Sequence, residues 1–172
     1  MQISRGKYKN RKIESIKSLD TRPTSSKTKE AIFNMIAFNV ENANVLDLFA
    51  GSGLLGIEAI SMYAKHVDFN DKNIDAIKNI EHNLNKLEIT NYTLSKLDAF
   101  KYLELNKEKI YDIIFLDPPY DLNIINDLLI MIINLNIIAE SGIIIVESSL
   151  SEQILNKYNN FSKVKEKKYG KN

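Results

Sequence analysis

The sequence of 172 residues contains no cysteine, three prolines and two histidines. Without cysteine the chain cannot form disulfides, thiolate zinc sites or a cysteine nucleophile. Two histidines, His66 and His82, are too few for a metal site without carboxylates, so no bound metal is expected. Residues 1–12 lack the apolar core of a signal peptide, and the longest aliphatic run, residues 128–133, is far too short to span a membrane. We therefore expect a cytoplasmic protein that does not contact membranes.

The composition indicates one folded domain. Hydrophobic residues make up 44% of the chain and charged residues 26%, which is ordinary for a globular protein and too apolar for a disordered tail. A chain of 172 residues can bury one substantial core and is short for two full domains. We therefore expect a single unit that folds alone and acts as a monomer.

A formal net charge of +1 hides a strong asymmetry along the chain. Residues 1–30 contain nine Lys and Arg against three Asp and Glu, and residues 157–172 contain six against one. The segment between them, residues 31–156, holds eight basic and eighteen acidic residues. The basic ends suit a polyanion such as a nucleic acid, although two solvated tails would show the same pattern.

Short β-branched runs alternate with helical spacing along most of the chain. The pattern predicts helices over residues 27–38, 54–64, 74–87, 99–105, 124–138 and 152–158. It predicts strands over residues 44–49, 66–70, 92–97, 111–116, 142–147 and 161–168. Several of these strands are continuous apolar runs, as in strands that helices cover on both faces. We therefore expect an α/β fold with a mainly parallel sheet, whose ligands bind beyond the carboxyl ends of the strands.

A glycine-rich segment follows the first predicted strand. Gly51, Gly53 and Gly56 form a G-x-G-x-x-G pattern between this strand and the next helix. Glycine removes the Cβ where a ligand must touch backbone, and the helix then points its free amide groups at the bound molecule. The pattern predicts a nucleotide-type cofactor site, although a tight turn alone would also need glycine.

Three aspartates follow the first three predicted strands. Asp71 lies twenty residues after Gly51, where a carboxylate can accept from both hydroxyls of a ribose; it could also simply begin the next helix. Asp47 would repel a pyrophosphate but attract the ammonium group of S-adenosylmethionine. Asp98 could accept from an adenine amino group or serve only as a helix N-cap. Asp47 therefore favours S-adenosylmethionine over a nicotinamide dinucleotide.

The fourth predicted strand ends in Asp117-Pro118-Pro119-Tyr120. The prolines stop the strand and withhold two amide donors. The amino group of a base is a poor nucleophile until acceptors bind its hydrogens, and Asp117 with the Pro118 carbonyl would be those acceptors. Tyr120 offers a ring on which the base could stack. These residues predict methylation of an exocyclic amine; a strand-terminating turn with a core tyrosine is the alternative, and the rarity of this four-residue string after an apolar strand argues against it.

Taken in order, these motifs resemble the RsmD family of class I S-adenosylmethionine-dependent methyltransferases, which methylate guanine N2 in bacterial 16S ribosomal RNA. The resemblance covers nearly the whole chain. It depends on residues 22–24, 29–34, 45–53, 98–99 and 115–120. It implies a Rossmann-like sheet of seven strands, in residues 27–172, after a basic N-terminal hairpin, in residues 1–26, that helps to grip RNA.

The family also implies roles for individual residues. It implies that S-adenosylmethionine contacts Asp47, Phe49, Ala50, Gly51, Ser52, Gly53, Asp71, Asp98 and Ala99. It implies that catalysis uses Asp117, Pro118, Pro119 and Tyr120. It implies that the 16S rRNA of the small ribosomal subunit binds to basic residues of the arm, here Arg5, Lys7, Lys9, Arg11, Lys12 and Arg22.

The chain departs from the family pattern in four places. It has Ser26-Lys27 for Asp-Arg, Arg5-Gly6 for a glycine pair and Asn70-Asp71 for Val-Glu. Asp71 is shorter than glutamate, so we expect altered cofactor affinity with unchanged chemistry. The chain also ends before the family's last strand, so a sheet of six strands is an alternative to seven.

Three other functions fit parts of the sequence. A DNA methyltransferase acting on adenine N6 or cytosine N4 would use the same motif after the fourth strand. A dinucleotide oxidoreductase would need a hydride-handling group at a strand end, and neither His66 nor His82 follows a predicted strand. A noncatalytic RNA-binding module would keep the fold without turnover, and the presence of Asp117 argues against it.

Overall fold

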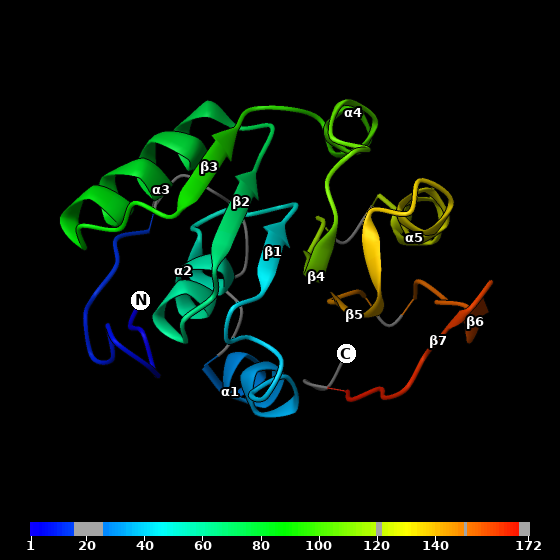
Figure 1. The fold of residues 1–172 in the computed structure, drawn as a ribbon, viewed down its shortest axis with the longest axis horizontal. Helices are drawn as coiled ribbons and strands as arrows, with labels where there is room; N and C mark the ends of the chain where they lie inside the picture. The colour runs from blue at the N-terminus through cyan, green and yellow to red at the C-terminus, as the bar shows by residue number, and fades with distance from the viewer. Residues whose placement is uncertain (16–25, 120–121, 150, 169–172) are drawn as a thin grey trace.

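The computed structural model describes residues 1–15, 26–119, 122–149 and 151–168. Its main sheet has five parallel strands in the order β3-β2-β1-β4-β5 (Figure 1). The strands are β1 (Asn44–Asp47), β2 (His66–Asn70), β3 (Tyr92–Ser95), β4 (Tyr111–Leu116) and β5 (Ile138–Val146). The helices are α1 (Ser26–Met35), α2 (Leu54–Ser61), α3 (Ile74–Lys86), α4 (Ala99–Leu105) and α5 (Ile125–Asn134). The predicted α/β fold with a parallel sheet is confirmed.

The C-terminal part differs from the sequence-based expectation. Within the described ranges the main sheet has five strands, and neither a sixth nor a seventh is shown. β6 (Lys157–Tyr158) and β7 (Phe161–Ser162) form a separate antiparallel pair. The helix expected over residues 152–158 is wrong, because part of this segment pairs as β6 and Glu152 caps a different helix.

The end of α5 also lies earlier than the apolar pattern indicates. The helix ends at Asn134, and Asn136 then adopts a left-handed conformation with φ of 54°. Asparagine tolerates this conformation better than most residues, so it can turn the chain into β5 without a glycine or proline. None of the helices in the described part of the chain is long and apolar enough to cross a bilayer.

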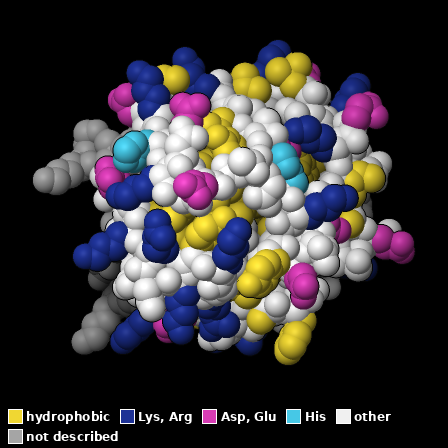
Figure 2. Space-filling view, turned by 60° about the vertical axis from the view of Figure 1, so that its left-hand side comes forward, with side chains coloured by type: hydrophobic (Ala, Val, Ile, Leu, Met, Phe, Trp, Pro, Cys, Tyr) yellow, Lys and Arg dark blue, Asp and Glu magenta, His cyan; other side chains and the backbone are white. Residues whose placement is uncertain are grey.

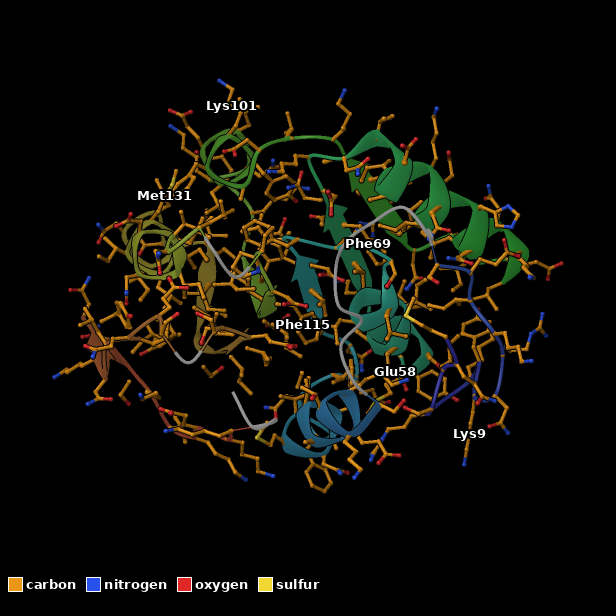
Figure 3. The ribbon with its side chains drawn as sticks, turned by 180° about the vertical axis from the view of Figure 1, so that it is seen from behind. Lys9, Glu58, Phe69, Lys101, Phe115 and Met131 are labelled. Carbon is orange, nitrogen blue, oxygen red and sulfur yellow. The ribbon has the colours of Figure 1, made fainter. Side chains whose placement is uncertain are left out.

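Helices cover both faces of the sheet and create two hydrophobic clusters. Residues of α1, α2, α3 and the N-terminal segment pack on one face, where the Phe33 and Phe115 rings lie 5.9 Å apart. Residues of α4 and α5 pack on the other face around Leu46 and Ile114. Figure 3 shows Phe69 and Phe115 between the sheet and the first group of helices. Burial on both faces explains why the strands are nearly continuous apolar runs.

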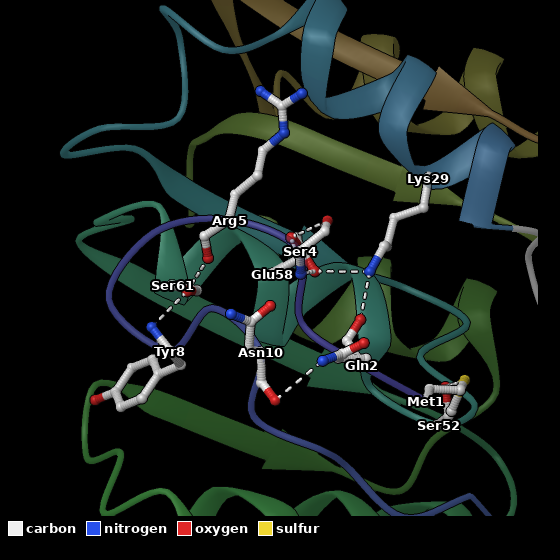
Figure 4. Close-up of polar contacts among 10 residues, drawn as sticks. All are labelled: Met1, Gln2, Ser4, Arg5, Tyr8, Asn10, Lys29, Ser52, Glu58 and Ser61. Carbon is white, nitrogen blue, oxygen red and sulfur yellow. Dashed lines mark hydrogen bonds and ion pairs between the residues drawn. The ribbon is translucent and has the colours of Figure 1, made fainter.

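The first thirteen residues form a hairpin-like loop that packs on α2. Gln2 and Lys12 form an antiparallel bridge, and the side chains of Ile3 and Ile13 are buried in the same cluster as α2. The Ser4 amide and hydroxyl donate to the carboxylate of Glu58 in α2 (Figure 4). The basic N-terminal segment is therefore held firmly against the body of the protein.

Candidate functional site

The site lies where the chain order of the sheet reverses. The chain proceeds from β1 outward through β2 to β3 and then returns to β4 on the other side of β1. Asp47 ends β1 and is paired in register with Phe115 of β4, so Asp117 lies two residues beyond this pair, just after the end of β4. In open α/β sheets ligands bind at this switch point, outside the carboxyl ends of the strands. The topology therefore brings the residues after β1 and β4 side by side.

The three glycines of the segment that follows β1, two in the loop and one in α2, meet different surroundings. Gly51 and Gly53 have φ of +51° and +77°, which side chains rarely adopt. A Cβ on Gly51 would meet only the Phe49 carbonyl oxygen at 3.9 Å, so this backbone is open to a ligand. A Cβ on Gly56 would lie 2.1 Å from the ring of Phe69, so Gly56 allows α2 to approach β2. Gly51 is therefore the glycine suited to contact a cofactor.

Asp47 is buried at the start of α2 and is 2% exposed. The Gly56 N–H donates to Asp47 Oδ2 over 3.0 Å, so Asp47 caps a helix whose N-cap residue, Gly53, has no side chain to do so. The pKa of Asp47 is raised to about 7, mainly by burial; the bond from Gly56 lowers it and the nearby charge of Asp71 adds to the increase. A cation beside this carboxylate would favour its ionised form.

Asp71 connects the loop after β2 to the glycine loop. The Gly51 N–H donates to Asp71 Oδ2 and the Asn73 N–H to Oδ1, each over 2.8 Å. These bonds fix both the Gly51 backbone and the turn before α3. Asp71 therefore contacts the glycine loop through the Gly51 amide, and its assignment to a ribose remains a prediction.

Asp98 lies at the N-cap of α4. Its Oδ1 accepts from the Phe100 N–H at 2.9 Å and from the Lys101 N–H at 3.4 Å. Asp98 therefore caps α4 through one of its two carboxylate oxygens. Its expected contact with adenine remains a prediction. Its neighbour Ala99 is buried at the first position of the helix.

Asn70, at the end of β2, has a structural role that its sequence context does not indicate. Its side chain is 1% exposed and donates to the carbonyls of Leu48 and Leu97 over 3.2 and 3.0 Å, while its Oδ1 accepts from the Leu97 N–H over 3.2 Å. Its own carbonyl accepts from the Ala50 N–H over 2.9 Å. Asn70 therefore joins the segments that follow β1, β2 and β3. The sequence offered one sign of this role, namely that the family has valine where this chain has Asn70.

The motif after β4 begins directly at the end of the strand. Asp117 is half-buried, Pro118 is buried and Pro119 is exposed. Glu147, which follows β5, donates its N–H to the Leu116 carbonyl over 2.8 Å and holds the end of β4 in place. The fourth residue of the motif, Tyr120, lies outside the described residues.

The N-terminal loop runs along α2: its first residue, Met1, accepts through sulfur from the Ser52 hydroxyl of the glycine loop over 3.7 Å, and its tip reaches the other end of the helix. The side chains of Lys7, Lys9, Arg11 and Lys12 are exposed. The Lys7 N–H donates to the carbonyl of Ser61, the last residue of α2, over 2.8 Å. At 1.5 Å per residue, the eight residues of this helix place that contact about 12 Å from the glycine loop.

The remaining basic residues of the arm are Arg5 and Arg22. Arg5 donates to Asn34 Oδ1 over 2.5 Å, so it also contacts α1. Arg22 lies outside the described residues. Figure 2 shows Lys and Arg side chains spread around a hydrophobic patch, on the face of the molecule that carries α3 and the N-terminal loop.

Comparisons with known proteins agree with this geometry. The family described as conserved hypothetical protein 95 matches residues 1–172. A relative from Buchnera aphidicola, named ribosomal RNA small subunit methyltransferase D, is 37% identical over 98% of this chain and 86% of its own length.

Two solved structures share the fold. The candidate methylase HI0767 of Haemophilus influenzae is 27% identical, with a TM-score of 0.82 over 98% of this chain and 92% of its own. SMU.776, a candidate methyltransferase complexed with SAH, shares the fold at 21% identity and a TM-score of 0.59, over 70% of this chain and 35% of its own. The chain thus has the class I methyltransferase fold and belongs to the conserved hypothetical protein 95 family, the RsmD family.

Proposed function

We propose that this protein transfers a methyl group from S-adenosylmethionine to the exocyclic N2 amino group of a guanosine in 16S rRNA of the small ribosomal subunit. One observation carries the proposal. Asp47, the open Gly51 backbone and Asp71 lie at the same switch point of the sheet as the strand end that leads to Asp117. The name of the Buchnera relative supports ribosomal RNA as the substrate. The choice of guanine N2, at position 966, depends on the family resemblance.

The residues at the ends of β1, β2 and β3 fit S-adenosylmethionine. Asp47 would pair with its ammonium group, Asp71 would accept from its ribose hydroxyls and Asp98 from its adenine amino group. The backbone from Phe49 through Ala50 and Ser52 to Gly53 would follow the cofactor past the open Gly51. When bound, this cofactor supplies an electrophilic methyl group on a sulfonium. SAH in the SMU.776 structure is the demethylated form of the same molecule and supports this choice.

Asp117 and the carbonyl of Pro118 would prepare the acceptor. The lone pair of a base amine is delocalised into the ring, so the amine becomes nucleophilic only as its geometry becomes tetrahedral. Two acceptors that bind its hydrogens favour this geometry, and their bonds strengthen as positive charge develops on nitrogen. Pro119 and Pro118 stiffen the backbone that presents these acceptors. The side chain of Tyr120 would then stack on the base.

The RNA would bind in part to the exposed Lys7, Lys9, Arg11 and Lys12 of the N-terminal loop, with Arg5 and Arg22 nearby in sequence. These side chains carry no sequence code, and phosphate contacts position a nucleic acid without reading it. The target base is therefore expected to be exposed in a structured loop, where extrusion is cheap.

The decisive experiment is mass spectrometry of 16S rRNA nucleosides from cells with and without the protein. The proposal expects more N2-methylguanosine in 16S rRNA from cells that contain the protein than in 16S rRNA from cells without it. In vitro, labelled methyl groups should be transferred to small-subunit RNA and not to naked DNA. Transfer to DNA alone would support the adenine N6 or cytosine N4 alternative, and transfer to neither would support a binding module.

A further inference from the structure

The short β6–β7 hairpin is attached to the first turn of α5. Glu152 Oε1 accepts from the Ile125 N–H over 2.9 Å and so caps this helix. Asn126 donates to the Gln153 carbonyl over 2.9 Å. Asn126 Oδ1 also accepts from the Leu155 N–H and from the Tyr158 hydroxyl. The hairpin is therefore fixed to the start of α5 by several side-chain bonds.

Apolar contacts strengthen the same attachment. Ile154, Tyr158 and Phe161 are partly buried against the cluster that α4 and α5 form with the sheet. The hairpin thus has a defined position on the body of the protein, beside the first turn of α5. Figure 1 shows β6 and β7 beside α5, at the edge of the molecule.

This position lies on the same edge of the sheet as the candidate site. α5 begins eight residues after Asp117, and its first turn lies at the carboxyl end of β4, as in other strand-helix units of a parallel sheet. The hairpin itself follows the carboxyl end of β5. By contrast, Lys7 contacts the far end of α2. The C-terminal hairpin is therefore attached to the helix that follows Asp117, whereas the tip of the N-terminal loop contacts the last residue of α2.

The hairpin and the residues after it are strongly basic. Residues 157–168 contain five lysines and one acidic residue, Glu166. Glu166 pairs with Lys163 over 2.7 Å. The other four side chains are exposed, and none makes an ion pair with the described residues: Lys157, Lys165, Lys167 and Lys168.

A basic surface at this edge solves an electrostatic problem for the proposed reaction. The site places Asp47, Asp71, Asp98 and Asp117 near the carboxyl ends of the strands, and carboxylates repel phosphate. An RNA that approaches these residues needs nearby cations to hold its backbone. The exposed Lys157 of β6 and the exposed lysines that follow β7 can supply them.

We propose that the C-terminal basic surface, residues 157–168, binds the sugar-phosphate backbone of the RNA beside the target nucleotide. This inference rests on the proposed function and deepens it, since it adds an RNA-contacting surface that the basic N-terminal loop does not provide. The surface positions the substrate and takes no part in the chemistry.

The test compares two double variants that each remove two exposed charges. K165Q/K167Q changes the C-terminal basic surface, and K65Q/K107Q changes the opposite edge, because Lys65 precedes β2 and Lys107 precedes β4. Binding to a 16S rRNA transcript is measured by fluorescence anisotropy across a salt series. Removal of one lysine–phosphate pair should reduce the slope of log K against log salt by about 0.7 to 0.9.

We expect K165Q/K167Q to weaken binding at least fivefold and to flatten the salt slope by about 1 to 2 units, with cofactor affinity and kcat unchanged. K65Q/K107Q should match the wild type. A slope for K165Q/K167Q equal to the wild-type slope would overturn the inference, as would an equal loss in both variants. Absence of RNA methylation by the wild type would instead refute the proposed function, while the binding comparison would still decide the role of the hairpin.

Discussion

Lys29 Nζ lies 3.0 Å from Glu58 Oε2, and the two side chains are 5% and 0% exposed. Lys29 also donates to the Gln2 carbonyl over 2.6 Å, and Glu58 accepts from the amide and hydroxyl of Ser4. This buried pair joins α1, α2 and the N-terminal loop at a single point (Figure 4). The position of the basic loop therefore depends on an ion pair within the core.

Removing one partner of this pair should destabilise the protein strongly. Lys29→Met leaves the Glu58 carboxylate buried without its cation, and breaking a buried pair in this way costs about 3 to 5 kcal/mol. Urea denaturation should show this loss. The double variant Lys29→Met/Glu58→Gln should recover part of the stability, because no unpaired charge remains.

Lys86→Met is the matched control for this prediction. Its partner Glu14 is exposed, so loss of the pair should change the urea midpoint little. Equal losses for Lys29→Met and Lys86→Met would show that burial of the Lys29–Glu58 pair has no energetic consequence.

The buried carboxyl of Asp47 should make stability depend on pH. Its pKa is about 7 in the folded protein and 3.8 in the reference state, with burial as the main cause. Between pH 3.8 and about pH 7 the folded state therefore binds more protons than the unfolded state. Asp47 thus favours folding at low pH, and this contribution to stability is lost as the pH rises through 7. Asp47→Asn should raise Tm at pH 8, because the ionised buried carboxylate costs about 1.4 kcal/mol of stability for each unit by which folding raises its pKa. At pH 4 the substitution should have little effect on Tm.

Replacement of Asp47 should have opposite effects on stability and on cofactor binding. Asparagine cannot attract an ammonium group, so Asp47→Asn should weaken S-adenosylmethionine binding in calorimetry while Tm at pH 8 increases. For the wild type, affinity should fall as the pH decreases below 7, because a protonated Asp47 loses its charge. A Tm at pH 8 that is unchanged or lower in Asp47→Asn would contradict the raised pKa.

Asn70 should affect cofactor binding through the backbone that it holds. Asn70→Ala leaves the carbonyls of Leu48 and Leu97 without their donor, which should cost about 1 to 3 kcal/mol of stability. The loops after β1 and β3 then lose their connection, so the dissociation constant of S-adenosylmethionine should increase. Turnover at saturating cofactor should be retained, because Asn70 does not touch the reacting atoms.

Asn91 offers a control of the same chemistry at the opposite edge of the sheet. Its amide donates to the carbonyls of Ala64 and Lys65 over 3.0 and 3.1 Å. Asn91→Ala should lower stability by a similar amount and leave cofactor binding unchanged. If both variants weaken cofactor binding equally, the effect of Asn70 is only a general loss of stability.

The parts of the fold that local pattern determines could be predicted from the sequence. β2, β4 and α4 have the expected bounds, because changes between apolar and polar residues mark their ends. The parallel topology then required the residues after β1, β2 and β4 to meet at one edge. The sequence was therefore sufficient to place Asp47, Asp71 and Asp117 together, although their chemical roles still await measurement.

The parts that depend on contacts between distant residues could not be predicted. The apolar spacing near Glu152 indicated a helix, but its side chain caps α5 at Ile125 and the chain continues into β6. Lys29 and Glu58 look like ordinary surface residues in the sequence, and only their burial identifies them as a pair. No local pattern contains such information, since the partners are 27 and 29 residues apart.

Asp117 should separate catalysis from cofactor binding. Asp117→Ala removes an acceptor for the hydrogens of the target amine, so turnover should fall by a factor of about 100 to 1,000. The dissociation constant of S-adenosylmethionine, measured by calorimetry, should change less than about tenfold, because the residue acts mainly in the transition state. Asp117→Asn keeps one acceptor oxygen without the charge, so its turnover should lie between those of the wild type and Asp117→Ala.

Asp127→Ala is the control for the loss of a carboxylate near this edge. Asp127 is exposed in the first turn of α5 and has no place in the proposed chemistry, so its removal should leave turnover unchanged. If Asp117→Ala instead lost cofactor affinity and turnover to the same extent, Asp117 would act in binding and not on the amine. Because the acceptor bonds strengthen as charge develops on nitrogen, only a selective loss of kcat agrees with the proposed role.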